Sequence, residues 1–512
     1  MRTSPIAALL SIAFSASAAT FHVAPPSAGG SDANPGTAEQ PFATIQRAAN
    51  SAFPGDTVLI APGTYTGFNV VRSGQPGLPV TFSAEPGVVI DAAAAPFNGG
   101  NHRSRINLDT VSHIVIEGFE VVGTNDLRNS AEGIRVVAPL AAGAGHITIR
   151  NNHAHHNGNR NIFTGFVSNL TIEGNTCHNA HKEHGIYISN SADNHVVRGN
   201  IVYDNAGAGL HVNADASLGG DGVITNVLVE ANIFHGNGAG GTYIDTAGNP
   251  QASPGGGSAV NFDGVRNSTV VNNLLYDNHA SGVSLYRIDG GQPSSFNVVV
   301  NNTIVNAPDA RWCVNIRDGS TDNAAFNNVL INRNTARGAI SITANSLTGF
   351  RSDHNIVSDR FDLGGSFITL AQWRTQTGQD LASIPRSPTH LPALFTSPAT
   401  GGYTLAPNSD AIDAGVGQFD EAAAPTSDLL GLPRPQGVGH DIGAYESPVC
   451  ALIGDIDGDG DVDFADLNAL LGAFNSAAGG PGYLPGADLD QDGHVDFADL
   501  NTLLSHFNAR CP

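Results

Sequence analysis

Two stretches near the C-terminus repeat one spacing of carboxylates. Residues 455–466 and 488–499 each place Asp at positions 1, 3, 5, 9 and 12 of twelve, with Gly at position 6. This spacing is typical of calcium-binding EF-hand loops, and carboxylates so close together repel each other unless a cation neutralises them. The sequence therefore predicts two Ca²⁺ ions. The predicted metal residues are Asp455, Asp457, Asp459, Asp461, Asp463 and Asp466, then Asp488, Asp490, Asp492, His494, Asp496 and Asp499, with Asp461 and His494 contributing backbone carbonyls.

Histidines gather in two neighbouring segments. Three lie between residues 153 and 156, and three more between residues 178 and 184. Stacked side by side, they could bind a transition metal through their imidazole nitrogens. The spacing lacks the tight paired pattern of a metal motif, so it favours groove or surface histidines over a metal site.

The elements that position these groups come from an internal repeat. A four-residue segment that begins with an apolar residue and ends in Asn recurs, as in Ile172–Asn175, Val197–Asn200 and Val299–Asn302. The aligned residues are Asn152, Asn175, Asn200, Asn232, Asn273, Asn302, Asn328 and Asn355, at spacings of 23, 25, 32, 41, 29, 26 and 27. Between them lie short stretches that alternate apolar and polar residues, which predicts several short strands in each repeat.

Such a repeat cannot bury its apolar side alone, but repeats stacked along one axis pair every strand with its neighbours. The sequence therefore predicts an all-β parallel β-helix solenoid with asparagine amides stacked at one corner. An antiparallel β-sandwich is the alternative, but it would not keep one Asn in phase over eight repeats. A helix within Pro41–Asn50, burying Ile45 and Ala48–Ala49, is predicted to cap the N-terminal end.

The remaining segments set the domain boundaries. Residues 1–18 combine Arg2, an apolar run and an Ala-Ser-Ala exit, which predicts a signal peptide and a secreted or cell-surface protein. Residues 19–390 form the capped β-helix, and 391–447 an irregular β cap closing its other end. Residues 448–512 form a small α-helical calcium-binding domain with helices over Leu467–Phe474 and Leu500–Phe507. No other stretch is apolar for the ~18 residues of a membrane span.

The net charge limits which partners the protein can bind, and the cysteines bear on the compartment in which it folds. The net charge of −23 opposes binding to nucleic acid. Cys450 and Cys511 bracket the acidic tail, and we expect them to form a disulfide. Cys177 occupies a strand position that is apolar in the other repeats, which predicts a buried filler.

Alternate strand residues face outward, and these predict a sugar-binding groove along one flank of the solenoid. The outward residues are polar, aromatic or cationic, groups that stack on sugar rings and bond to hydroxyls and carboxylates. The predicted substrate-binding residues are Arg135, Tyr187, Asn213, Asn261, Tyr286, Asn315 and Arg317, with Ser189 and Ser284 on the same stripe. Long insertions at about Ala214–Gly222 and Thr246–Gly257 are expected to wall the groove beside His211 and Asp263.

Three short sequence motifs, each typical of a turn, resemble those of a known family. Asn34–Thr37, Pro54–Val58 and Pro62–Tyr65 resemble the N-terminal part of secreted right-handed β-helix proteins, a group that includes the family 9 pectate lyases and the chondroitinase-B-like lyases. The resemblance covers roughly residues 20–360. It implies a right-handed solenoid and β-elimination from an acidic, uronate-containing polysaccharide.

Elimination needs a base to remove the C5 proton and a cation to neutralise the adjacent carboxylate. Lys182 is the only lysine beside 22 arginines, and we expect it to be the base, although a solvated turn residue remains open. The predicted catalytic set is Lys182, His211, Arg287 and Asp263, with Arg135, Arg287 or Arg317 as the neutralising cation. The resemblance also implies a groove calcium, whose candidate ligands are Glu183, Asp215, Asp221 and Asp263.

The calcium loops resemble a dockerin module, which implies a cohesin-like protein partner. Position 12 is Asp, as in dockerins, rather than the Glu of ordinary EF-hands. The sequence leaves open a glycoside hydrolase acting in the same groove, with Asp263 and a second carboxylate. It also leaves open a non-catalytic carbohydrate-binding or structural β-helix protein.

Overall fold

The structure is a computed structural model that describes residues 18–98, 100–448, 452–458 and 460–509. The predicted signal peptide up to residue 17 and the predicted Cys450–Cys511 disulfide lie outside these residues. The chain divides into two compact units. The N-terminal unit runs to Gly222 and includes Ala239–Gly255, and the C-terminal unit comprises Val223–Gly238 and the chain from Gly256 onward.

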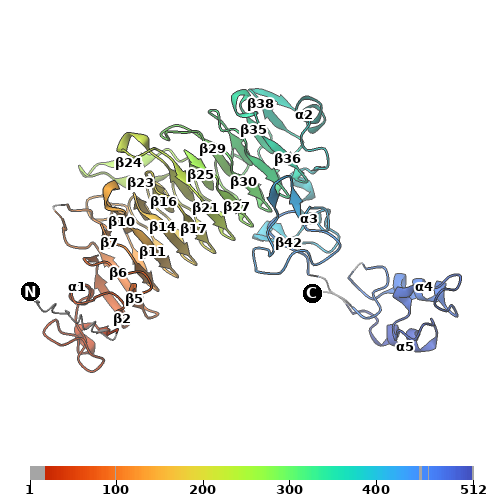
Figure 1. The fold of residues 1–512 in the computed structure, drawn as a ribbon, viewed down its shortest axis with the longest axis horizontal. Coiled ribbons are helices and arrows are strands. Elements are labelled where there is room, and N and C mark those ends of the chain that lie inside the picture. The colour runs from red at the N-terminus through yellow and green to blue at the C-terminus, as the bar shows by residue number, and fades with distance from the viewer. Residues whose placement is uncertain (1–17, 99, 449–451, 459, 510–512) are drawn as a thin grey trace, which may run out of the picture. The chain divides into compact units, whose positions relative to one another are not determined.

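In the N-terminal unit the chain winds repeatedly through three parallel sheets and adds about one strand to each sheet per coil (Figure 1). Sheet 1 contains β1 (Thr20–Val23), β2 (Thr57–Ile60), β5 (Val80–Ala84), β8 (Ile114–Glu117), β11 (Gly145–Arg150), β14 (Ser168–Glu173) and β17 (His195–Arg198). Sheet 2 contains β3 (Gly63–Thr66), β6 (Val88–Ala92), β9 (Glu120–Val122), β12 (His153–His155), β15 (Thr176–His178) and β18 (Ile201–Tyr203). Sheet 3 contains β4 (Phe68–Val70), β7 (Ile106–Asp109), β10 (Glu132–Val137), β13 (Arg160–Gly165), β16 (Ile186–Ser189) and β19 (Leu210–Asn213).

The C-terminal unit contains coils of the same three-sheet design. Its sheet 1 strands are β21 (Val227–Glu230), β27 (Thr269–Val271), β30 (Val298–Val300), β33 (Ala324–Phe326) and β36 (Arg351–Asp353). Its sheet 2 strands are β22 (Ile233–His235), β28 (Leu274–Tyr276), β31 (Thr303–Asn306), β34 (Val329–Asn332), β37 (Ile356–Val357) and β40 (Ile384–Pro385). Its sheet 3 strands are β25 (Val260–Asp263), β29 (Val283–Tyr286), β32 (Val314–Ile316), β35 (Ile340–Ile342), β38 (Phe361–Leu363) and the antiparallel β39 (Ser366–Ile368). The same unit also contains a separate two-stranded parallel sheet of β20 (Ile224–Thr225) and β26 (Val265–Arg266).

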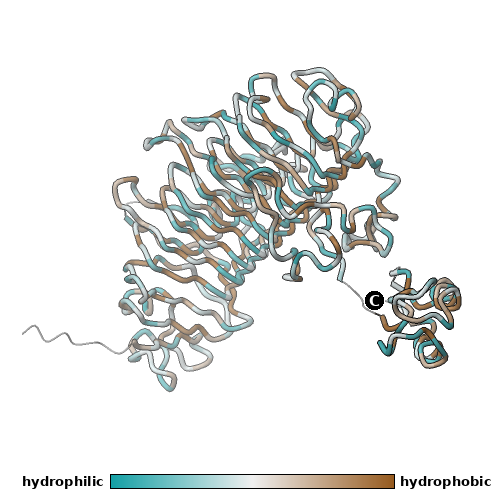
Figure 2. The backbone as a smooth tube through the Cα atoms, turned by 45° about the vertical axis from the view of Figure 1, so that its right-hand side comes forward, coloured by the Kyte–Doolittle hydropathy of each residue, from teal (hydrophilic) through white to brown (hydrophobic). Residues whose placement is uncertain are grey.

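Strand alternation fills the interior of the coils. The side chains predicted to face inward are at most 1% exposed in both units: Ile186, Ile188, Leu210, Val212, Val260, Phe262, Val283, Leu285, Val314 and Ile316. Hydrophobic and hydrophilic residues alternate along the coils in Figure 2. Cys177 is fully buried, and burial raises the pKa of its thiol. The predicted parallel β-helix and the filler role of Cys177 are confirmed.

Asparagine amides stack within each unit, as predicted. In the C-terminal unit the backbone N–H and Nδ2 of Asn302 both donate to Oδ1 of Asn328, at 2.9 and 3.0 Å. Nδ2 of Asn302 also donates to the carbonyls of Val270 and Val300. The same bonds join Asn152 to Asn175 and Asn175 to Asn200 in the N-terminal unit, and Asn232 to Asn273, Asn273 to Asn302 and Asn328 to Asn355 in the C-terminal unit.

The caps differ from the predictions. Helix α1 (Ile45–Ala49) is present and buries Ile45, Ala48 and Ala49, but it is shorter than expected because Phe42 still pairs with Val23 of β1. An unpredicted helix, α2 (Leu370–Thr377), follows β39, and its buried Trp373 stacks on Phe361 of β38 at 4.8 Å.

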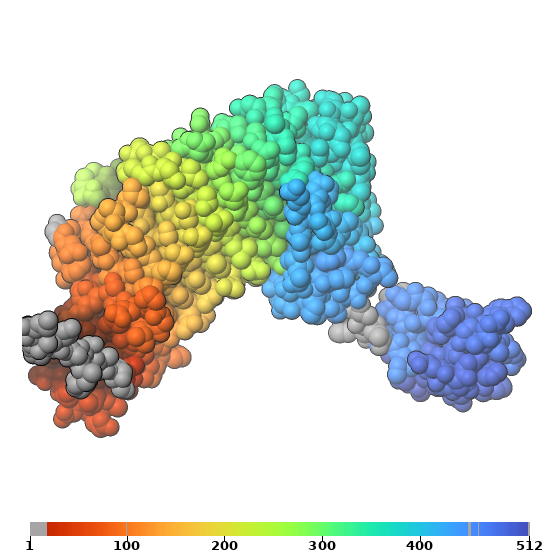
Figure 3. Space-filling view, viewed as in Figure 1, coloured from red at the N-terminus to blue at the C-terminus, as the bar shows by residue number. Residues whose placement is uncertain are grey.

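Residues 391–447 do not close the end of the stack, which corrects the prediction. They contain α3 (Leu391–Leu394), β41 (Phe395–Ser397), β42 (Gly402–Leu405), β43 (Gln418–Phe419) and β44 (Ala422–Ala423). Leu394, Tyr403 and Ile442 pack on outward residues of sheet 2, among them Val305 and Val329, so this segment covers the side of the C-terminal unit (Figure 3). The apolar outward face of those strands explains the placement.

The helical domain at the C-terminus has its own small core of Val462, Leu470, Ala487, Val495 and Leu503. Its helices are α4 (Phe464–Ala473) and α5 (Phe497–Ser505), and each begins three residues before the predicted start. The reason is a capping box, in which Asp463 and Asp496 accept from the first turns of the two helices.

Candidate functional site

The predicted outward residues form one row on sheet 3 of the N-terminal unit. The strand register aligns Arg135 of β10 with Phe163 of β13, then Tyr187 of β16, then His211 of β19. Ser189 and Asn213 form a second aligned pair, two residues further along the same two strands. The rings of Tyr187 and His211 stack at 5.0 Å, and Asn213 Nδ2 donates to the Tyr187 hydroxyl at 3.1 Å. The parallel register thus brings together residues that are far apart in the sequence.

A network of charges surrounds this row. Arg160, which the sequence analysis missed, lies 3.1 Å from Glu132 and 2.5 Å from Glu183. Its guanidinium also lies over the rings of Phe163 and Tyr187. The predicted base, Lys182, places Nζ 3.1 Å from Glu183 Oε1. Glu183 is therefore paired with two cations, which argues against its predicted role as a calcium ligand.

Two histidines beside the network are held in one tautomer. The N–H of Ala208 donates to His184 Nδ1 at 2.9 Å, so the neutral His184 ring carries its proton on Nε2. That Nε2 lies 3.1 Å from His211 Nδ1 and donates to it, which leaves the proton of His211 on its own Nε2. Burial and the nearby Arg160 lower the pKa of His211 to about 4. Near neutral pH, His211 is therefore a hydrogen-bond donor at Nε2 and not a base there.

The long insertions lie beside these residues. The hairpin of β23 (Gly241–Ile244) and β24 (Pro250–Ser253) packs over the Lys182 segment, because Ser253 Oγ donates to the Lys182 carbonyl and Lys182 Nζ lies 5.7 Å from the Tyr243 ring centre. The other insertion is anchored at Ser191, whose Oγ donates to the Gly219 carbonyl. The hairpin is thus a wall for Lys182 within the N-terminal unit.

A second row lies on sheet 3 of the C-terminal unit. The register aligns Asn261, Ser284, Asn315, Ser341 and Asp362 on consecutive strands. A groove of about 630 Å³ opens over this row. Its walls carry both the predicted Tyr286 and Arg317 and residues that the sequence analysis missed: Arg311, Trp312, Asp318, Arg337, Asp362 and Phe367.

Arginines and aromatic rings dominate this groove. Arg317 is held by Nε donating to Asn315 Oδ1 at 2.8 Å and Nη2 donating to Ser341 Oγ at 3.2 Å. Its distance to Asp362 is 3.8 Å, a loose ion pair. Arg337 lies over the Phe367 ring, which contacts Trp312. Three arginines and two aspartates line the groove, so in a chain of net charge −23 this surface attracts anions.

The two predicted catalytic residues of the C-terminal unit lie in different surroundings. Asp263 is 1% exposed, and its carboxylate accepts the backbone N–H groups of Ile288, Asp289 and Gly290 at 2.9–3.0 Å. Burial raises the pKa of Asp263, opposed by these three bonds. This geometry gives Asp263 a structural task, holding the loop after β29, while Arg287 is exposed on that loop.

A groove calcium has no geometric support among the described residues. Asp215 caps a short helical turn through Ser217, and Asp263 is engaged by backbone as above. Neither these two nor Glu183 and Asp221 belong to a described group of three closely spaced potential ligands.

The tail loops, in contrast, gather their carboxylates. Ligand oxygens of Asp455, Asp457 and Asp466, and likewise of Asp488, Asp490 and Asp492, lie within 4.8 Å of one another. A third such group joins Asp461 and Asp463 to Asp466. Asp466 and Asp499 play identical parts, since each accepts two backbone N–H groups at the start of its loop. An all-oxygen donor set of this kind fits Ca²⁺; Asp459 lies outside the described residues.

A protein-family model described as the Pel9A-like right-handed β-helix region matches residues 22–303. The chain belongs to this family. Among solved structures, the Pel9A-like chain is similar to the pectate lyase Pel9A, with a TM-score of 0.51 and 18% identity over 84% of this chain and 97% of that one. It is also similar to an alginate lyase from Paenibacillus sp., with a TM-score of 0.43 and 17% identity over 63% of this chain and 97% of that one.

A curated relative, an uncharacterized protein YwoF of Bacillus subtilis, is 34% identical over 127 residues. These are 24% of this chain, and the match spans about a quarter (26%) of the relative's length. The Pel9A-like region contains Lys182 and the row that ends at His211, but it ends before the arginines of the groove, Arg311, Arg317 and Arg337. None of the described helices is both long and apolar enough to cross a lipid bilayer.

Proposed function

We propose that this Pel9A-like protein is secreted, binds an acidic, uronate-containing polysaccharide and cleaves it by β-elimination. The observation that carries the proposal is the groove of the C-terminal unit, where Arg311, Arg317 and Arg337 stand beside Trp312 and Phe367. Guanidinium groups recognise carboxylates through paired hydrogen bonds, and aromatic faces stack on sugar rings. A polymer with one carboxylate per sugar matches a row of such groups.

Arg317 is the best-placed residue to neutralise the uronate carboxylate. Asn315 and Ser341 fix its orientation, and Asp362 at 3.8 Å leaves most of its charge available. Neutralising the carboxylate makes the C5 proton acidic enough to be removed, after which the C4–O bond breaks and an unsaturated end forms. Lys182, the base predicted from the sequence, lies in the N-terminal unit beside Glu183 and Tyr243, outside this groove, and its role is tested separately by Lys182→Ala.

The test is a screen of uronate polymers for ultraviolet absorbance of unsaturated ends. Activity on one polymer is expected, with kcat/KM reduced about 100-fold or more in Arg317→Gln. The matched control is Arg351→Gln, which removes a partly exposed arginine paired with Asp420 outside the groove. Lys182→Ala that leaves the activity intact would remove Lys182 as the base. An Arg317→Gln variant with unchanged activity would contradict the groove assignment.

Glycoside hydrolysis is the second candidate, because Asp318 and Asp362 line the same groove and hydrolysis needs two carboxylates. Asp362 is anchored by Ser341 Oγ and by the N–H of Gly365, both at 2.8 Å. New reducing ends without unsaturation, abolished in Asp318→Asn, would favour this reaction. Binding without cleavage would instead favour a non-catalytic carbohydrate-binding protein.

For the tail we propose two Ca²⁺ ions and, from the dockerin resemblance, a cohesin-like partner. The clustered carboxylates of the two loops support the ions. Exposed apolar pairs on the helices support a protein partner, since Phe464 and Phe497 are both 70% exposed. A pull-down with a cohesin panel, with and without chelator, tests this; calcium-dependent capture is expected, and no capture with calcium present would contradict it.

A further inference from the structure

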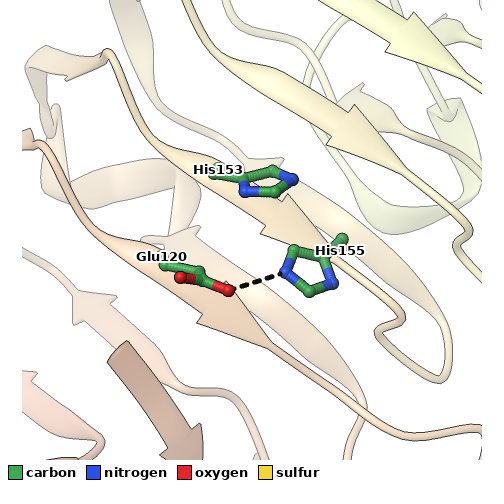
Figure 4. Close-up of side chains that lie close together, drawn as sticks. All are labelled: Glu120, His153 and His155. Atoms are coloured by element: carbon green, nitrogen blue, oxygen red, sulfur yellow. Dashed lines mark hydrogen bonds and ion pairs between the residues drawn. The ribbon is translucent and has the colours of Figure 1, made fainter. Parts of the chain in front are cut away.

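A cluster of imidazoles lies on sheet 2 of the N-terminal unit, apart from the sheet 3 row. Three consecutive strands contribute to it. The register places His153 of β12 beside Glu120 of β9, and His155 of β12 beside His178 of β15. Figure 4 shows Glu120, His153 and His155 side by side on neighbouring strands, with the carboxylate directed at His155.

The potential ligand atoms converge. His155 Nε2 lies 3.3 Å from Glu120 Oε1, and His153 Nε2 lies 2.8 Å from His178 Nε2. One ligand atom from each of Glu120, His153 and His155 lies within 4.8 Å of the other two. The rings of His155 and His178 are parallel, 4.9 Å apart and tilted by 2°. Three of these ligands therefore converge directly, and His178 of the next coil meets them through His153.

Neighbouring side chains orient these rings. His178 Nδ1 lies 2.6 Å from Asn179 Oδ1, and because an amide oxygen only accepts, Nδ1 carries the proton. The lone pair of His178 Nε2 is thereby directed at His153. His155 Nδ1 lies 2.7 Å from a nitrogen of His156, which leaves its Nε2 directed at Glu120. A hydrogen bond at the second ring nitrogen is typical of histidines that bind a metal.

We propose that Glu120, His153, His155 and His178 bind one divalent transition-metal ion of the zinc class. Imidazole nitrogens with one carboxylate suit Zn²⁺ and related ions, whereas Ca²⁺ takes oxygen ligands. Ligand nitrogens of a tetrahedral zinc site are about 3.3 Å apart. The ion would replace the proton between His153 and His178, with a small outward movement of the rings. Its effect is to join three coils across their hydrogen-bonded strands.

The experiment uses the full chain with millimolar Ca²⁺, which fills the tail loops. Titration with Co²⁺ is expected to give one equivalent with the visible absorption of tetrahedral cobalt, displaced by one equivalent of Zn²⁺. His155→Asn is expected to weaken Zn²⁺ binding about 100-fold or more, measured by calorimetry. The control is His113→Asn, which removes a ring from the stacked pair His113–His146 of the same unit and is expected to leave binding unchanged.

Three results would overturn the site. They are no stoichiometric binding of Co²⁺ or Zn²⁺, unchanged affinity in His155→Asn, or loss of the bound ion to excess Ca²⁺, which would place it in the tail. Circular dichroism checks the fold of each variant. If His155→Asn fails to fold, Glu120→Gln decides, because it keeps the side-chain shape; weaker Zn²⁺ binding is expected, and wild-type affinity would contradict the proposal.

Discussion

The solenoid repeats asparagine and the tail loops repeat aspartate. The two regions differ in how the polar atoms of these side chains find hydrogen-bond or ionic partners. Asn302 in the solenoid donates to Asn328 and accepts from Asn273, so identical amides complete each other. Asp455 and Asp457 in the first tail loop belong to a group of carboxylates that can only accept. A stack of amides is therefore complete within the chain, whereas carboxylates clustered in this way repel one another unless a cation from outside joins them.

Calcium removal separates the two regions most strongly. We expect a chelator to unfold the tail domain, whose core is small and whose carboxylates then repel, and to leave the solenoid transition in place. At Ca²⁺ about 1,000 times above Kd, each ion adds about 4 kcal/mol to the free energy of unfolding. Differential scanning calorimetry with and without chelator measures this. A solenoid transition that shifts together with the tail would break the comparison.

Exchanging an amide for a carboxylate tests the solenoid. In Asn302→Asp the side chain can no longer donate to Val270, Val300 and Asn328, and it brings a charge to a fully buried position. We expect the free energy of unfolding to fall by roughly 3–5 kcal/mol.

The matched control is Asn267→Asp, an exposed turn residue with φ of 51°, a conformation that Asp also adopts. It is expected to change stability by less than about 0.5 kcal/mol. Chemical denaturation followed by circular dichroism measures both variants. Similar losses in the two would mean that the ladder contributes nothing beyond the turn.

The sequence predicted the solenoid and its amide ladder because both depend on repetition. A second ladder escaped notice, although Asn157 and Asn205 each follow a ladder residue by five positions, as Asn237 and Asn278 do. In the structure Asn237 donates to Asn278, and Asn161 donates to Asn205. The signal was present, but alanine (Ala180, Ala307) or arginine (Arg333, Arg360) replaces Asn at this position in the other repeats and hides the period.

The site was predicted less well, for a physical reason. Strand alternation identified Tyr187, His211 and Asn315 as outward, and the register confirmed their rows. Alternation does not reveal which outward groups pair with each other. Arg160 and Arg337 come from turns or strand starts, where no period applies, and Asp263 turns back to bind a loop. Pairing depends on the loops, which the repeat does not specify.

Acid is expected to affect the solenoid before the tail. His195 is fully buried, Nε2 donates to the Ala192 carbonyl at 2.8 Å, and burial lowers its pKa to about 4. The unfolded chain takes up a proton near pH 6.5, so the free energy of unfolding falls as the pH drops from 6.5 toward 4. The loss is about 3 kcal/mol for this one residue. Thermal unfolding across this range, with Ca²⁺ present, measures it.

The variant His195→Gln keeps an N–H donor but cannot take up the proton. Its solenoid transition is expected to vary less between pH 6.5 and 4 than that of the wild type. Aspartate carboxyl groups ordinarily take up protons near pH 4, so protons displace Ca²⁺ mainly at the acid end of this range. An equally steep pH dependence in His195→Gln would assign the acid sensitivity to other groups.

The smallest expected effect comes from neutralising one tail ligand. Asp490→Asn keeps an oxygen at position 3 of the second loop but removes one negative charge, so Ca²⁺ binding at that loop should weaken about tenfold. This equals about 1.4 kcal/mol, far less than Asn302→Asp removes from the solenoid. Calorimetric titration of the variant should show two Ca²⁺ sites of different affinity, whereas the two sites of the wild type should have similar affinities. If Asp490→Asn instead unfolded the tail even with Ca²⁺, this carboxylate would act within the protein as the ladder amides do, and the contrast between the two regions would fail.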